Sequence, residues 1–231
     1  SGSASWEIAR QGVGDDTQWT LAPLPVSFSP GTVVNTADPG SPIAPGGLIS
    51  IYGRGLSGAA VQVNGQNATV LAATPFQVNA QVPFETATGS ALLSVVTPNG
   101  AAQQTISVSD VGPAIFSISP GQAAIANEDN STNTSANPAN RGSSMVIYAA
   151  GLGAVTPSPV TPTDSLSVVS TPVSVVMNGV EVPATASLSS TTTGVYQVNV
   201  QVPESLPPGL ELPLYLKQGG VTSNTVSVAI Q

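Results

Sequence analysis

Side chains that could carry out covalent chemistry are scarce in this chain of 231 residues. It contains no His and no Cys, so a Ser nucleophile would lack an imidazole base and no thiolate is available. Lys217 is the only lysine, and a Ser–Lys dyad or an intramolecular isopeptide cross-link would need it in an apolar core, where burial neutralises the amine. It directly precedes Gln218-Gly219-Gly220, a predicted hairpin turn in which a lysine is solvated. We therefore expect no enzyme activity, and a cross-link through Lys217 stays an open alternative.

One loop carries oxygen-bearing side chains at alternate positions, which is a pattern that suits Ca²⁺. Asp129, Ser131 and Asn133 lie in the run Asn-Glu-Asp-Asn-Ser-Thr-Asn that starts at residue 127. The run has only two carboxylates and no glutamate placed to bind through both oxygens. We predict a hydrated loop between two strands, with no metal and no cofactor, and keep a Ca²⁺ loop as the alternative. An acid-pair enzyme using Glu128 and Asp129 would need a further carboxylate, and the spacing singles out none.

Three Asn-X-Ser/Thr sequons could accept a glycan. They begin at Asn67, Asn130 and Asn133. The stretch 156–171 is rich in Ser, Thr and Pro and could instead carry O-linked sugar. Such short sequons also occur by chance, so both kinds of glycan stay open.

The chain is organised around a heptapeptide that occurs twice. Gln77-Val78-Asn79-Ala80-Gln81-Val82-Pro83 returns as Gln197-Val198-Asn199-Val200-Gln201-Val202-Pro203, with six of seven positions identical. Val alternates with polar residues, which predicts a half-buried strand, and Pro is tolerated where a strand ends. The chain is therefore a tandem duplication.

The amides of the heptapeptide allow two interpretations. A carbohydrate-binding face would place exposed aromatic rings beside them, and Phe76 and Tyr196 directly precede the two copies. We favour a structural role, in which Asn79 and Asn199 hydrogen-bond loop backbone and fix the strand where it enters the Pro turn.

The duplication divides the chain into two units, residues 23–110 and 111–231, behind an arm of residues 1–22. Short alternating segments separated by turn signals such as Asn64-Gly65 and Asn178-Gly179 predict β-sandwiches. Tyr52 and Tyr148 are 96 residues apart, whereas Gln77 and Gln197 are 120 apart. The second unit therefore has an insertion near 155–171, predicted to be a long surface loop or an extra edge strand.

Composition limits the partners and the compartment. Twelve acidic and four basic residues give a net charge of −8, which argues against nucleic acid and against an anionic membrane surface. Charged residues make up only 7%, far below the usual quarter, so the surface is predicted to be neutral-polar and extracellular. No apolar run is long enough to cross a bilayer. The absence of a Met and of a signal peptide at Ser1 suggests a processed mature form or a cloning remnant.

The arm has an apolar alternation of its own. Its large residues are Trp6 and Ile8, then Trp19 and Leu21 after a break rich in Gly and Asp. The arm could add a strand to its own first sandwich, or it could be a donor strand that completes the sheet of a neighbouring subunit.

Each unit resembles the immunoglobulin-like IPT/TIG domain of plexins and some transcription factors. The matching residues are Ser29-Pro30, Pro45-Gly46-Gly47, Ile49-Ser50-Ile51-Tyr52-Gly53-Arg54-Gly55-Leu56 and Asn64-Gly65. The resemblance implies an immunoglobulin-like sandwich for each unit.

Residues 25–231 further resemble a duplicated module at the C-termini of secreted bacterial proteins of unassigned function. The matching residues are Ala44-Pro45-Gly46, Gln77-Val78-Asn79, Asn137-Pro138-Ala139, Gly151-Leu152-Gly153 and Tyr196 to Pro203. This resemblance implies extracellular sandwiches and brings no catalytic residues. The module usually comes after a larger protein, whereas here only the arm precedes it, so we expect the pair to be the functional unit.

These observations predict an all-β protein with two tandem immunoglobulin-like β-sandwiches and an extended N-terminal arm. The leading hypothesis is a subunit of a pilus-like surface filament or matrix, a head-to-tail homopolymer joined through Trp6, Ile8, Trp19 and Leu21. The alternative is a monomeric cell-surface adhesin or carbohydrate-binding module.

Overall fold

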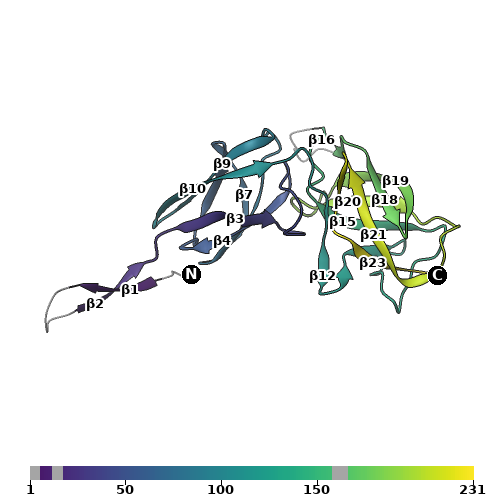
Figure 1. Cartoon of the computed structure of the whole chain (residues 1–231), viewed down its shortest axis with the longest axis horizontal. Helices are drawn as coiled ribbons and strands as arrows, with labels where there is room; N and C mark the ends of the chain where they lie inside the picture. Colours follow the sequence, from purple (N-terminus) through teal and green to yellow (C-terminus); the bar gives the residue numbers. More distant parts are fainter. Residues whose placement is uncertain (1–5, 12–17, 158–165) are drawn as a thin grey trace.

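The computed structural model describes residues 6–11, 18–157 and 166–231, with side-chain burial from residue 23 onward. Every regular element in these ranges is a β-strand, which confirms the all-β prediction. Figure 1 shows two sandwiches placed end to end, with a separate β-ribbon beyond the first one. Each sandwich has its own apolar core.

The first sandwich consists of two four-stranded antiparallel sheets. One has the order β3 (Ser27–Asn35), β4 (Leu48–Arg54), β8 (Gln77–Gln81), β7 (Thr69–Ala73); the other has the order β10 (Gly100–Val108), β9 (Gly89–Thr97), β5 (Ala60–Val63), β6 (Gln66–Asn67). With the two-residue strand β6 left unlettered and the other seven strands lettered A to G along the chain, these are an ABED sheet and a GFC sheet. That is the strand order of a constant-type immunoglobulin domain, so the immunoglobulin-like prediction is confirmed.

The second sandwich repeats this order with longer connections. Its first sheet contains β11 (Ala114–Ile115), β14 (Ile125–Asn127), β15 (Ser144–Ala150) and β20 (Tyr196–Gln201); its second contains β18 (Val173–Met177), β21 (Gly209–Gln218), β22 (Val221–Thr222) and β23 (Val226–Ile230). The long strand β19 (Val180–Leu188) belongs to both, because its first half pairs with β18 and its second half with β20. In the first sandwich, β6 and β7 divide between the two sheets in the same way.

The two copies of the heptapeptide occupy the same place in the two sandwiches. Tyr52 lies opposite Gln77 in the β4–β8 pair, and Tyr148 lies opposite Gln197 in the β15–β20 pair. The intervening valines and alanines are buried in both cores: Val78, Ala80, Val82, Val198, Val200 and Val202. The duplication therefore preserves strand register as well as sequence.

The polar contact that both copies of the heptapeptide share comes from its second glutamine. Gln81 Nε2 donates to the carbonyl of Gly46 at 3.0 Å, and Gln201 Nε2 donates to the carbonyl of Gly142 at 3.2 Å. Both glycines have positive φ and form the turn that leads into the neighbouring strand. The prediction that the asparagines perform this task is wrong, because Asn79 accepts hydrogen bonds from side chains and Asn199 lies exposed on the sheet.

The insertion of the second sandwich widens its first sheet. The short strands β16 (Val155–Thr156) and β17 (Val168–Val169) pair with each other, and Val168 also pairs with Ser187 of β19. The predicted insertion thus begins and ends as edge strands, while residues 158–165 lie outside the described residues.

Hydrogen bonds and close backbone contacts join the two sandwiches. The buried side chain of Asn35 donates to the carbonyls of Pro42 and Gly112 at 3.0 and 3.1 Å, and Gly112 N donates to Gly151 O at 2.7 Å. Phe84, which lies just after the first heptapeptide, packs against the core of the second sandwich. The junction is therefore closely packed, since several of its glycines leave no room for a Cβ.

Candidate attachment surfaces

The N-terminal arm is a β-hairpin. β1 (Trp6–Gln11) and β2 (Gln18–Pro23) pair antiparallel over their whole length. Residues that lie opposite each other in such a pair share a face of the sheet. Trp6 pairs with Pro23, Ile8 with Leu21 and Arg10 with Trp19, so one face gathers the large apolar residue types together with Arg10.

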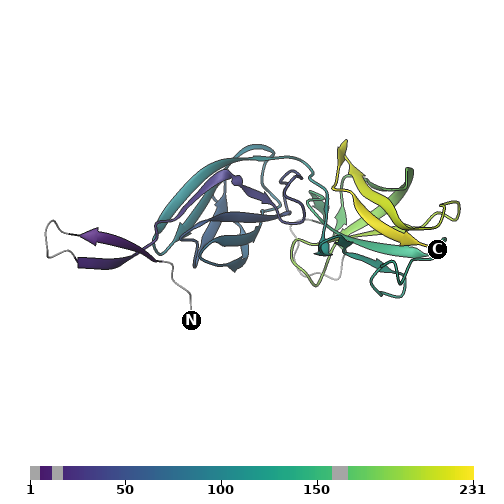
Figure 2. The same ribbon diagram turned by 60° about the horizontal axis from the view of Figure 1, so that its bottom comes forward.

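The hairpin forms a sheet of its own. Among the described residues, β1 and β2 pair with no other strand, and Figures 1 and 2 show the ribbon extending away from the first sandwich. The alternative in which the arm adds a strand to its own first sandwich is therefore wrong. An isolated two-stranded hairpin is at best marginally stable in water. Packing against a partner would therefore stabilise this hairpin.

A groove lies along the last strand of the second sandwich. The segment that precedes β15 is tied to the β22–β23 segment at two places: the Asn224 amide bonds both backbone groups of Ile115, and Ala139 N donates to Ala229 O. Between these ties the chain turns outward as the hairpin of β12 (Ser117–Ser119) and β13 (Gln122–Ala123). Neither strand of this hairpin pairs with β23, although β13 lies close beside it.

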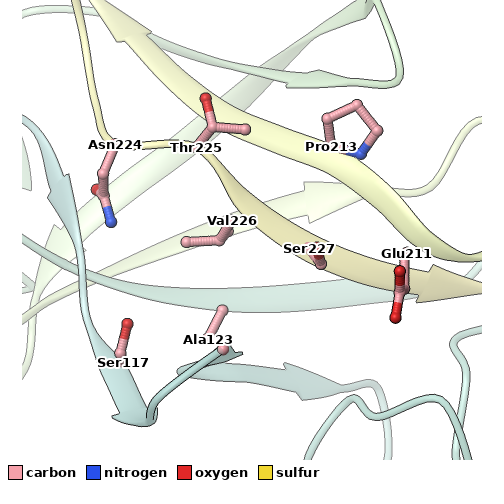
Figure 3. A pocket seen from close by; sticks show the side chains of 9 residues that line it. Ser117, Ala123, Glu211, Pro213, Asn224, Thr225, Val226 and Ser227 are labelled. Atoms are coloured by element: carbon pink, nitrogen blue, oxygen red, sulfur yellow. The ribbon is translucent and has the colours of Figure 1, made fainter.

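The groove encloses about 310 Å³ and is lined by Ser117, Gly121, Ala123, Glu211, Pro213, Asn224, Thr225, Val226 and Ser227. Figure 3 shows Ser117 and Ala123 on one side and the β21 and β23 residues on the other. Its volume is at the lower end of the range for small-molecule pockets, ~300–1,000 Å³. No aromatic ring lines it, and Glu211 is its one charged residue. We call it the β23 groove.

A second surface carries aromatic rings beside amides. On the outer face of the first sandwich, Tyr52 is 45% exposed and Phe76 is 59% exposed. Gly53 N donates to Phe76 O, and Gln77 lies opposite Tyr52 and donates to Asn79 Oδ1 at 2.8 Å. The second copy lacks this arrangement because its aromatic residue at the equivalent place, Tyr196, is fully buried.

The hydroxyl of Tyr196 lies buried in the core of the second sandwich, where it cannot contact a ligand. It donates to the carbonyl of Gly153 at 2.8 Å, and burial raises the pKa of Tyr196 far above its usual value of 10.0.

Lys217 lies on the surface of the second sandwich. Its Nζ donates to Glu181 Oε2 at 2.6 Å, and both side chains are nearly half exposed. The hydrogen bond with Glu181 raises the pKa of Lys217 and the same bond lowers the pKa of Glu181. A cross-linking or catalytic lysine needs the opposite environment, buried and with a depressed pKa, so the geometry disfavours both alternatives for Lys217.

The candidate Ca²⁺ loop is held together by its own hydrogen bonds. The Asp129 carboxylate accepts from the backbone and the hydroxyl of Ser131, and these bonds lower its pKa. Asn133 is 3% exposed, and its amide pairs with Asn127 and with both backbone groups of Ala229. Asp129 and Ser131 therefore lie together, as the Ca²⁺ prediction requires. The Asn133 amide is hydrogen-bonded to Ala229 of β23 instead, so it is not available as a third Ca²⁺ ligand.

The same burial corrects one glycosylation candidate. A glycan attached to Asn133 would have to leave through the core, and its amide nitrogen already donates two hydrogen bonds. Asn67 and Asn130 lie exposed in the folded protein, so only these two sequons are sterically open.

Within the described ranges, no group of three or more acidic residues is arranged to hold a metal ion. In that part of the chain, too, no helix is long and apolar enough to cross a membrane.

No family model matches the chain, and no curated protein is similar to it in sequence. Among solved structures it is similar to the plexin A4 extracellular region (14% identity, TM-score 0.29, 75% of this chain and 13% of that one). It is also similar to the Bacteroides ovatus glucan-utilization protein SGBP-B in complex with a mixed-linkage heptasaccharide (12%, 0.31, 82% and 42%) and to the I9–I11 tandem from titin (12%, 0.26, 97% and 73%).

The chain thus spans less than half of the first two of these structures. Likenesses at such TM-scores carry no argument, and the immunoglobulin-like assignment rests on strand order. The likeness to a duplicated bacterial module stays a prediction. By its strand order and pairing, the chain is a tandem of two immunoglobulin-like sandwiches that carries a free-standing apolar hairpin.

Proposed function

We propose that this chain is an extracellular structural protein, a subunit of a surface filament or matrix in which the N-terminal hairpin of one copy docks on the next. The observation that carries the proposal is the pairing of β1 and β2 with each other and with no other strand in the described chain. Its apolar residue types fall in register on one face, which is the pattern of a strand pair that packs on a partner.

The charge composition supports an extracellular location. With only 7% charged residues and a net charge of −8, the surface is dominated by Ser, Thr, Asn and Gln. Such a surface has no basic footprint for nucleic acid.

The junction between the sandwiches supports a load-bearing role. Inter-domain contacts within a chain are commonly small and permit motion. Here Asn35 bridges to Gly112, and Phe84 enters the second core, so the two sandwiches are expected to move as one body. A stiff unit with an attachment element at one end is the geometry required for a head-to-tail polymer.

The experiment compares matched substitutions within the hairpin. Ile8→Asp places a charge in the apolar register, opposite Leu21, whereas Ala9→Asp places the same charge in the other register, opposite Thr20. Light scattering after size exclusion and negative-stain electron microscopy should show polymers for the wild type and Ala9→Asp. Ile8→Asp and a chain lacking residues 1–22 should give particles of one chain.

Circular dichroism and thermal unfolding of each variant control for the integrity of the sandwiches. A wild-type protein that remains monomeric at high concentration, or an Ile8→Asp protein that polymerises normally, would contradict the proposal.

A second candidate function, carbohydrate binding, is favoured by the exposed pair Tyr52 and Phe76 beside Gln77 and Asn79. Aromatic rings provide apolar faces and amides provide directional hydrogen bonds, which is the usual composition of a ligand site. A glycan array followed by titration calorimetry tests it. Phe76→Ala should abolish binding while Phe84→Leu, at the sandwich junction, should not, and an array without hits would remove this candidate.

A further inference from the structure

We infer that the free edge of β7, in the first sandwich, is the acceptor for the N-terminal hairpin of a second copy, whose strand β1 pairs with it and extends the sheet. The inference rests on the proposed function and names the surface on which the hairpin docks. It combines three features of the described residues: an exposed sheet edge, an added strand at the same edge of the second sandwich, and the charges on the two elements.

The edge of β7 is open to solvent over its second half. β7 ends its sheet and pairs with β8 alone. The neighbouring strand β5 approaches the start of β7, where Ala68 N donates to Val61 O at 2.9 Å. Beyond this point residues 71–74 are all exposed, so the end of β7 is uncovered in a single chain.

The backbone at this edge has groups that no described strand pairs. Thr74 N donates to Gln77 O at 2.8 Å, which directs the peptide groups of Thr74 toward β8. Peptide groups alternate along a strand, so Ala73 directs its N–H and C=O away from β8. No described strand pairs with β7 on that side. Edge groups of this kind are templates for an added strand.

The duplication identifies the equivalent edge in the second sandwich. Ala73 of β7 lies opposite Val78, and Ala186 of β19 lies opposite Val198, the corresponding valine of the second heptapeptide. Ala73 and Ala186 therefore hold the same position in the two sandwiches, and the second half of β19 corresponds to β7.

In the second sandwich a strand occupies this edge. Ser187, which follows Ala186, pairs with Val168 of β17, and Leu188 N donates to Ser167 O at 2.9 Å. β17 belongs to the insertion of the second sandwich, and the first sandwich has no counterpart of it. The fold thus admits an added strand at this edge, and beside β7 a single chain does not supply one.

The hairpin suits this position in length and in charge. Each of its strands has six residues and one edge that pairs with no described strand. β2 ends in Pro23, which lacks an N–H, so β1 is the better strand for pairing. Residues 55–84 contain no charged residue, and the two hairpin strands carry one acid and one base, Glu7 and Arg10. Docking here therefore brings no like charges together, although the whole chain has a net charge of −8.

Exposed apolar side chains flank the edge. Leu71 is 45% exposed, and Phe76, in the turn between β7 and β8, is 59% exposed. The hairpin has large apolar residue types in register on one face, among them Ile8 opposite Leu21. Burying apolar surface of both partners adds to the backbone hydrogen bonds of the docked strand.

Docking of this kind joins two different surfaces, the hairpin of one copy and the β7 edge of the next. Its repetition produces a filament, unless two copies exchange hairpins and close as a dimer.

The natural lack of cysteine permits a direct cross-linking test. One population carries Ala9→Cys in β1, and a second, distinguished by a mass tag, carries Ala73→Cys in β7. They are mixed and treated with a short bismaleimide, which does not require one exact register. The matched control acceptor is Ala101→Cys, at another exposed alanine, on the strand β10 that ends the other sheet of the same sandwich. The mixed dimer should form several-fold more with Ala73→Cys than with Ala101→Cys.

Lysine at the same two acceptor positions gives an independent readout. A lysine on an edge strand opposes strand addition, so Ala73→Lys should abolish the polymers detected by light scattering, whereas Ala101→Lys should retain them. Hydrogen–deuterium exchange reports on the backbone: the amides of residues 71–74 should exchange more slowly in the wild-type polymer than in a chain lacking residues 1–22. Thermal unfolding of each variant verifies that the sandwiches are intact.

The outcomes separate this acceptor from the proposed function. Preferential cross-linking at Ala73, with loss of polymers for Ala73→Lys, supports the inference. Equal cross-linking at Ala73 and Ala101, or normal polymers from Ala73→Lys, overturns the β7 acceptor and leaves the proposed function in place. Closed dimers that cross-link at Ala73 support the acceptor and overturn the filament. A wild type that stays monomeric overturns both.

Discussion

Leu48 of the first sandwich lies so close to Gly194 of the second that a Cβ on Gly194 would stand 2.4 Å from a Leu48 methyl carbon. Leu48 is buried although it belongs to neither core. Its burial therefore comes from the junction, and the junction requires a residue without a side chain at position 194.

Gly194→Ala is expected to destabilise the protein more than a glycine substitution matched in backbone conformation. Gly194 and Gly220 have φ of 71° and 81°, and alanine in this left-handed region costs about 1–2 kcal/mol at either site. Only Gly194→Ala adds the clash with Leu48, which should cost about 1–3 kcal/mol more. Gly220 has no atom near its Cβ position. Urea unfolding measures both, and equal losses would show that the Leu48 contact yields without strain.

Asn35→Ala should loosen the junction itself. Asn35 is 1% exposed and donates to the carbonyls of Pro42 and Gly112, so its removal leaves buried acceptors unpaired at a cost of about 1–3 kcal/mol. Small-angle scattering should show a broader distribution of inter-sandwich distances. The control is Asn67→Ala at an exposed site, where a change within about 0.5 kcal/mol is expected. An unchanged scattering profile for Asn35→Ala would mean that Phe84 and the glycine contacts hold the junction without it.

Tyr196→Phe removes one buried hydroxyl. The carbonyl of Gly153 then loses its donor, and the free energy of unfolding should fall by about 1–3 kcal/mol. Tyr52→Phe serves as the control because Tyr52 is half exposed, and its effect should stay within about 0.5 kcal/mol. Denaturant titration of both variants checks the difference, and a neutral Tyr196→Phe would indicate that the core relaxes around the carbonyl.

Stability should be nearly independent of pH between about 6 and 9, because the chain has no His to titrate there. The pKa of Glu181 is lowered by its bond to Lys217, so this contribution is present above the ordinary value of 4.5 and is lost as pH falls through the lower folded pKa. The pKa of Lys217 is raised, so its contribution is present below 10.5 and is lost as pH rises further. Tyr196, whose pKa burial raises, also lowers stability on the alkaline side.

Melting temperatures across pH 3–11 test this profile. Lys217→Met should flatten the alkaline limb only in part, since Tyr196 remains. A stability maximum that is sharp near neutrality would contradict the expectation.

The sequence predicted the parts of the fold that depend on local periodicity. Alternation around Val78 and Val198, and the Asn-Gly turns, are sufficient to place the strands, and the repeated heptapeptide indicates the duplication. Strand order could not be read from these signals, because β19 divides between two sheets by a bend that alternation does not encode.

The candidate sites were less predictable because they depend on three-dimensional context. Phe76 and Tyr196 hold the same place ahead of the heptapeptide, yet one is exposed and the other is buried. The two apolar segments of the arm were evident, but their pairing was not, since the intervening residues carry no short-turn signal. The β23 groove forms because β12 and β13 pair with each other and not with β23. No residue type in the sequence predicts that these strands do not pair with β23.

The parallel contacts at the end of each sandwich have a mechanical consequence. Ser109 N donates to Ile43 O in the first sandwich, and in the second the backbone of residues 139–141 bonds that of Ala229 and Gln231. Tension along the chain pulls the two segments of each contact in opposite directions along their length. The three hydrogen bonds of the second contact are then sheared together instead of opening one after another, so the second sandwich is built to resist stretching where β23 ends.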